Sequence, residues 1–131
     1  MKRIFLLVGL VLLISPLAAC KSASNTDNSP AQNPTVTMDA TTFQNTTMTI
    51  SKGQTITFTD DATTGTPHIL VIGKDGSPDD ETGAADFDGT TGKSFQPGES
   101  WTSPPWNTPG TYYVTCTIHP TTMTLTVIVT G

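Results

Sequence analysis

The feature that most constrains the fold is a two-residue alternation that begins at about Thr35 and continues to the C-terminus. In "TMTISKGQTITFTD", residues 47–60, apolar side chains take every second position at Met48 and Ile50 and again at Ile56 and Phe58. A period of two places alternate side chains on opposite faces of a strand, and the intervening threonines suit the solvent-facing side. The pattern therefore predicts half-buried β-strands.

Further strand signals follow along the chain, separated by turns. The apolar run "HILVI" (68–72) suits a central strand, and "KSFQPGESWT" (93–102) is typical of two strands joined by a turn. The segments "GTYYVTC" (110–116) and "TLTVIVT" (124–130) complete the set. About seven to eight short strands in residues 35–131, with no helical period, predict an all-β fold, an antiparallel β-sandwich.

One internal segment breaks this rhythm. Residues 73–93, "GKDGSPDDETGAADFDGTTGK", are rich in glycine and aspartate. We expect a long loop there, too polar to contribute to the core, with at most one helical turn. Its acidic side chains either steer a basic partner or only keep the protein soluble.

The N-terminus has the parts of a signal sequence: a basic start, the apolar run "IFLLVGLVLLI" and then "LAAC". This ending resembles a bacterial lipobox, which implies lipid on the sulfur of Cys20; an ordinary cleavage site with an incidental cysteine is the alternative. We expect a signal peptide at 1–19, a lipidated cysteine and flexible tether at 20–34, and a folded domain at 35–131. The protein is then exported and anchored to the extracytoplasmic face of a membrane.

The charge balance argues against nucleic acid as a partner. The chain has 6 Lys and Arg against 11 Asp and Glu, and removal of Lys2 and Arg3 with the signal leaves four against eleven, a net charge of −7. The basic surface that phosphate backbones require is missing.

The two cysteines have different expected fates. If Cys20 carries lipid, Cys116 has no disulfide partner, so it is either buried and inert or bound to something. In its strand Cys116 shares a face with Val114 and is expected to point inward. The turn that must follow carries His119 and Met123.

These groups have a chemical preference in common. Thiolate, thioether and imidazole donors suit copper, and two histidines with one cysteine and a long axial methionine form the blue-copper arrangement. The second imidazole is His68, after Pro67 at the start of the apolar strand. Taken singly, each residue has an ordinary structural role; taken together, they predict a copper site.

The residues "KGQTITFTD", Pro67-His68, "PGES" and "PGTYYVTCTIHPTTM" resemble the cupredoxin family of type 1 blue copper proteins and are similar to plastocyanin and amicyanin. The resemblance implies a Greek-key sandwich that binds one copper ion and passes single electrons, without enzymatic activity. It implies His68, Cys116 and His119 as equatorial ligands and Met123 as the weak axial one. The family usually has Asn after the first histidine, where this chain has Ile69.

We therefore expect a membrane-anchored monomer that carries electrons between redox partner proteins. Docking is expected around Ile118 and Pro120, on either side of His119. Copper storage or delivery with the same ligands, without redox cycling, is one alternative; a structural sandwich without metal is another.

Overall fold

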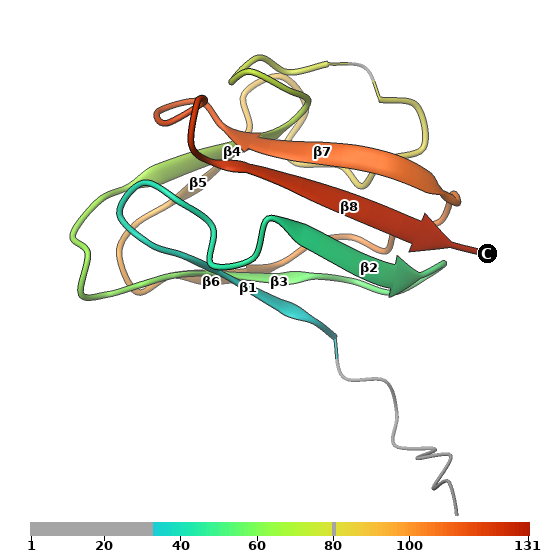
Figure 1. Cartoon of the computed structure of the whole chain (residues 1–131), viewed down its shortest axis with the longest axis horizontal. Helices are drawn as coiled ribbons and strands as arrows, with labels where there is room; N and C mark the ends of the chain where they lie inside the picture. The colour runs from blue at the N-terminus through green and yellow to red at the C-terminus, as the bar shows by residue number, and fades with distance from the viewer. Residues whose placement is uncertain (1–32, 80) are drawn as a thin grey trace, which may run out of the picture.

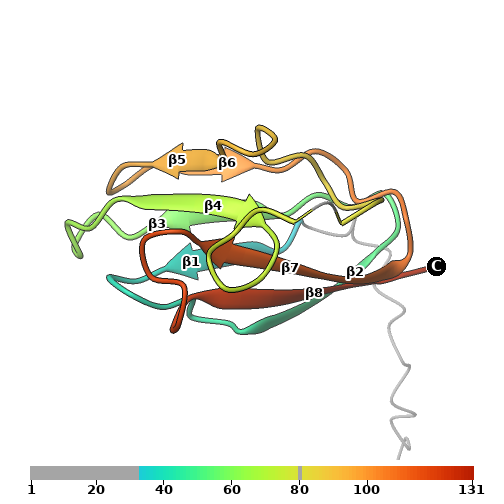
Figure 2. The ribbon, with the colours of Figure 1, turned by 90° about the horizontal axis from the view of Figure 1, so that it is seen from above.

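The alternating segments form eight strands in two facing sheets (Figure 1 and Figure 2). The computed structural model describes residues 33–79 and 81–131, so the predicted signal peptide, Cys20 and nearly all of the predicted tether lie outside the described residues. Among the described residues, no helix is long and apolar enough to span a membrane. The strands are β1 Thr35–Met38, β2 Thr47–Ser51, β3 Thr57–Asp60, β4 His68–Ile72, β5 Lys93–Phe95, β6 Ser100–Thr102, β7 Gly110–Cys116 and β8 Thr124–Thr130.

The smaller sheet has the order β1-β3-β6 and the larger sheet has the order β2-β8-β7-β4-β5. The predicted all-β sandwich is confirmed, but its sheets are mixed. Strands β1 and β3 pair in parallel, as do β2 and β8, whereas the other pairings are antiparallel. The chain passes from one sheet to the other between β1 and β2 and between β2 and β3, so these sequential strands do not form hairpins.

The core lies between the sheets and consists mainly of residues that the alternation placed inward. The fully or nearly fully buried apolar side chains include Val36, Met38, Ile50, Ile56, Phe58, Leu70, Val114, Leu125, Val127 and Val129. The threonines between them are mostly exposed or half-buried. The largest of the fully buried side chains is Trp106, which lies in the segment between β6 and β7.

The long loop 73–93 differs from the prediction in one respect. Its described residues form turns and no helix, as expected of a loop, but Ala85 and Phe87 are 4% and 1% exposed and belong to the core. The prediction that this segment is too polar for the core is wrong at these positions. Asp86 and Asp88 on either side of Phe87 are exposed, so the alternation survives locally and turns the ring inward.

Candidate metal centre

Two neighbouring strands of the larger sheet bring the predicted ligands together at one end of the sandwich. His68 is the first residue of β4, Cys116 is the last residue of β7, and these antiparallel strands pair through Leu70 and Cys116. His119 follows in the turn between β7 and β8 (Figure 1). Residues 48 positions apart in sequence are neighbours because the start of one strand lies beside the end of the other.

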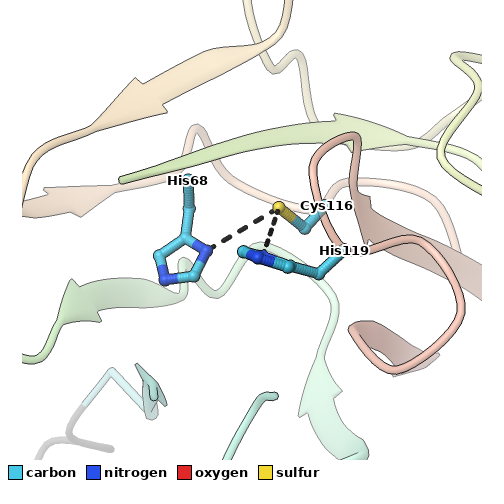
Figure 3. Close-up of side chains that lie close together, drawn as sticks. All are labelled: His68, Cys116 and His119. Carbon is cyan, nitrogen blue, oxygen red and sulfur yellow. Dashed lines mark hydrogen bonds between the residues drawn. The ribbon is translucent and has the colours of Figure 1, made fainter. Parts of the chain in front are cut away.

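The three donor atoms face one another (Figure 3). The Cys116 Sγ lies 3.7 Å from Nδ1 of His68 and 4.0 Å from Nδ1 of His119. The imidazole rings meet edge to face, with centroids 5.5 Å apart and an interplanar angle of 63°. All three donor atoms lie within 4.8 Å of one another, so the fold assembles the predicted Cys–His–His group.

Burial differs between the two imidazoles. His68 and Cys116 are fully buried at 0% exposed, whereas His119 is half-buried. The Cys116 thiol forms no disulfide in the described part of the chain. The cluster is thus closed to water on the His68 side and approaches the surface at His119.

Backbone hydrogen bonds fix the turn that carries His119. The His119 carbonyl accepts the backbone N–H of Met123 at 3.0 Å, and the Met123 carbonyl accepts that of Cys116, also at 3.0 Å. The Thr115 hydroxyl, itself buried, donates to the same Met123 carbonyl at 3.3 Å. The Met123 side chain is fully buried in the hydrophobic core, and its role as axial ligand remains a prediction.

A second backbone contact joins the two ligand-bearing segments. The backbone N–H of Thr117 donates to the carbonyl of Ile69 at 2.9 Å. Any residue at position 69 can accept this bond, because the acceptor belongs to the main chain. The segments are therefore tied together despite the absence of the usual Asn side chain.

Sequence reasoning missed one buried acid beside the cluster. The Asp60 Oδ1 lies 3.6 Å from Nε2 of His68, on the side of the ring opposite Cys116, and both side chains are 0% exposed. The signal was present in the alternation, since Asp60 continues the inward series of Ile56 and Phe58. An acid at an inward position is unusual and indicates a specific role.

Burial sets the electrostatics of this pair. Desolvation raises the pKa of Asp60 above its usual 3.8, opposed by the attraction of His68. Desolvation lowers the pKa of His68 below 6.5, opposed by Asp60 and by the backbone of Asp39. A lowered pKa keeps the His68 ring neutral, which is the form that binds a metal.

The size and chemistry of the cluster fit a single soft metal ion. Two bonds of about 2.0–2.3 Å that meet near 120° end roughly 3.5–4 Å apart, close to the spacing of the Cys116 sulfur and the two imidazole nitrogens. One sulfur and two imidazole donors in a trigonal set are typical of copper. The residues present therefore fit a copper ion.

Comparison with known proteins agrees with this chemistry. The sequence profile of the copper binding proteins of the plastocyanin/azurin family matches residues 31–130. The chain belongs to this family, and its cofactor is copper. No curated protein sequence matches the chain significantly.

Solved structures with the same fold include several amicyanins. The amicyanin of Paracoccus versutus (Thiobacillus versutus) has a TM-score of 0.55 and 22% identity, over 79% of this chain and 86% of that one. A reduced proline-to-phenylalanine variant of amicyanin has a TM-score of 0.53 and 20% identity, over 88% of this chain and 92% of that one. A methionine-to-alanine variant of amicyanin in its Cu(I) form has a TM-score of 0.53 and 18% identity, over 75% and 82% of the two chains. These likenesses show that the fold is shared.

Proposed function

We propose that the protein carries single electrons between redox partner proteins, with copper held by His68, Cys116 and His119 and more weakly by Met123. The observation that carries the proposal is a buried thiol placed between two imidazoles, of which one is buried and the other reaches the surface. Copper supplies the one-electron chemistry. The protein supplies fixed donors and a dry environment.

The positions of the donors suit fast electron transfer. His68 and Cys116 are held in paired strands, and backbone hydrogen bonds close the turn at His119. Donors that are fixed by the fold move little when the charge at the site changes, so little reorganisation opposes the transfer. The half-buried ring of His119 is the natural path between the buried thiol and a partner.

The surface beside His119 supports docking. Ile118 is 46% exposed and is the one exposed large hydrophobic side chain among the described residues. Pro120, on the other side of His119, is half-buried and packs closely against Gly76. A side chain at position 76 would place its Cβ only 2.6 Å from the Cβ of Pro120. Ile118→Glu is expected to slow electron exchange with partners and to leave copper binding intact; an unchanged exchange rate would exclude this surface.

Reconstitution with Cu(II) tests the electron-transfer function. We expect an intense thiolate-to-copper absorption band, a paramagnetic resonance spectrum of a copper–thiolate site, and reversible one-electron reduction. The band should be absent in Cys116→Ser. Rapid release of copper to an acceptor, with no stable Cu(II) form, would instead favour storage or delivery. A Cys116 thiol that remains freely alkylatable with Cu(II) present would exclude both.

We further propose that Cys20 is lipidated and anchors an exported monomer to the extracytoplasmic face of a membrane. The support is the "LAAC" sequence after an apolar signal-like segment. Cell fractionation should find the wild-type chain with membranes and Cys20→Ala largely released from them. Equal membrane association of both would refute the anchor.

A further inference from the structure

Asp60 and His68 form a buried pair in which the facing polar atoms have no other partner among the described residues. The two carboxylate oxygens of Asp60 and Nε2 of His68 have no hydrogen bond within residues 33–79 and 81–131. Buried polar groups are nearly always hydrogen-bonded, since an unpaired one costs the fold free energy. The separation of 3.6 Å is just beyond hydrogen-bonding range, so a small rotation of either side chain would close it.

The geometry divides the two nitrogens of His68 between two tasks. Nδ1 faces the Cys116 sulfur at 3.7 Å, while Nε2 faces the Asp60 carboxylate (Figure 3 shows the first contact). A histidine that binds a metal through one nitrogen usually donates the N–H of the other to an oxygen. That bond fixes the tautomer and the direction of the ring.

We propose that Asp60 is a positioning residue of the copper site. Its carboxylate accepts the Nε2–H of His68, aims Nδ1 at the metal, and adds a negative charge that favours Cu(II) over Cu(I). The effect of this charge on Cu(II) and Cu(I) rests on the proposed function, because it concerns a redox couple. A fixed negative charge in a poorly solvated region stabilises the more positive oxidation state.

The backbone holds Asp60 in place for this task. Its N–H donates to the carbonyl of Glu99 at 2.8 Å, and its carbonyl accepts the N–H of Gly98 at 3.0 Å. It is also the last residue of β3, in register with Met38. The carboxylate is thus presented from an anchored strand end. The backbone of Asp39 also raises the pKa of His68 and is an alternative hydrogen-bond acceptor for its ring.

Two substitutions separate charge from hydrogen bonding. Asp60→Asn removes the charge but keeps an acceptor oxygen, whereas Asp60→Leu removes both and keeps the same branched arrangement of heavy atoms. Asp61→Asn is the matched control, because it removes the same charge one residue away. The Asp61 carboxylate accepts two hydrogen bonds of 2.7 Å from Thr63, and an Asn there keeps an acceptor.

The full chain with each substitution is titrated with Cu(II) and with Cu(I) in competition with chelators, and its reduction potential is measured. We expect Asp60→Leu to weaken Cu(II) binding by about 10–100-fold. We expect Asp60→Asn to weaken Cu(II) about tenfold more than Cu(I), which equals a rise of ~59 mV in potential. Asp61→Asn should change neither by more than about twofold, since Asp61 is only half-buried and solvent screens its charge.

The preference for Cu(II) over Cu(I) distinguishes this role from a merely structural one. Copper-free Asp60→Leu should be less stable than wild type, because the buried Nε2–H of His68 loses its acceptor, and Asp60→Asn should lose less because it keeps an acceptor oxygen. A loss of stability alone weakens Cu(II) and Cu(I) binding equally and leaves the reduction potential unchanged. Equal weakening of both ions in Asp60→Asn would therefore overturn the electrostatic part of the proposal, and unchanged Cu(II) affinity in Asp60→Leu would overturn the positioning part.

A measurement on the copper-free protein keeps this inference separate from the electron-transfer function. Nitrogen NMR of His68 at neutral pH should show the proton on Nε2 in wild type and a mixture of tautomers in Asp60→Leu. If wild type binds copper without reversible redox chemistry, the proposed function fails while the tautomer result still stands. If the tautomer is the same in both chains, the positioning role fails whatever the redox result.

Discussion

Replacing Phe87 by alanine tests how far the long loop between β4 and β5 contributes to the core. The ring is 1% exposed, and its centroid lies 5.0 Å from that of Trp101, 5.4 Å from that of Phe58 and 6.2 Å from that of Trp106. Truncation of a buried phenylalanine costs about 3–5 kcal/mol. Aromatic pairs add about 0.5–1.5 kcal/mol beyond burial. We therefore expect the loss to lie near the upper end, about 4–5 kcal/mol.

Such a loss is a large part of the stability of a small domain, which is typically about 5–15 kcal/mol. At about 4–8 °C per kcal/mol for a domain of this size, Phe87→Ala should lower Tm by roughly 16 °C or more. Urea and thermal unfolding of the copper-free chain, followed by circular dichroism and tryptophan fluorescence, measure the change. Fluorescence is suited because two of the three ring neighbours are tryptophans.

Thr90→Ala in the same loop is the control. Thr90 is exposed, so its truncation should change the free energy of unfolding by less than about 0.5 kcal/mol. Phe87→Leu, which keeps much of the buried volume, should fall between the two. If Phe87→Ala costs no more than Thr90→Ala, the loop does not contribute to the core and the reasoning is refuted.

Three further predictions follow from single sites. Met123→Leu keeps the buried volume and should cost less than about 1.5 kcal/mol, yet alter the copper absorption spectrum and potential; an unaltered spectrum would exclude an axial thioether. Ser103→Ala removes the hydroxyl oxygen that accepts the Ile56 N–H and the Trp106 Nε1–H at 3.1 Å each, so urea unfolding should show a loss of about 1–3 kcal/mol per unpaired donor; a loss below 1 kcal/mol would contradict this. Because burial lowers the pKa of His68 from 6.5, the folded state binds its proton less readily than the unfolded state. The contribution of His68 to copper-free stability is therefore complete above pH 6.5 and declines as pH falls from there toward the folded pKa. Thermal unfolding between pH 7.5 and 5.5 should show this decline in wild type, and an equally steep decline in His68→Gln would assign it to another group.

The strands and three members of the site were predictable because each depends on local pattern. Alternation alone placed Ile56, Phe58 and Val114 in the core, and the same parity turned Cys116 inward. The proximity of His68 to Cys116 required only that both stand at strand ends. The resemblance to a known family then joined residues that lie far apart in sequence.

Other features depend on three-dimensional packing and had weaker local signals. The parallel pairing of β1 with β3 is decided by how the chain passes between sheets, which no strand pattern encodes. The segment around Phe87 is polar in sequence because aspartates flank the ring, although the alternation in "DFD" indicates that the ring points away from them. Asp60 has the same parity as Ile56 and Phe58, but only the structure shows the imidazole that it faces.

The direction of β1 places the N-terminal entry to the domain and the copper site at opposite ends of the molecule. At one end of β1 Thr35 pairs with Thr57, and at the other Met38 pairs with Asp60, next to His68. The strand therefore runs toward the copper site, and the chain enters the domain at the opposite end (Figure 1). A tether upstream of Thr35 would therefore join the domain at the end far from His119 and leave the site uncovered by its own attachment.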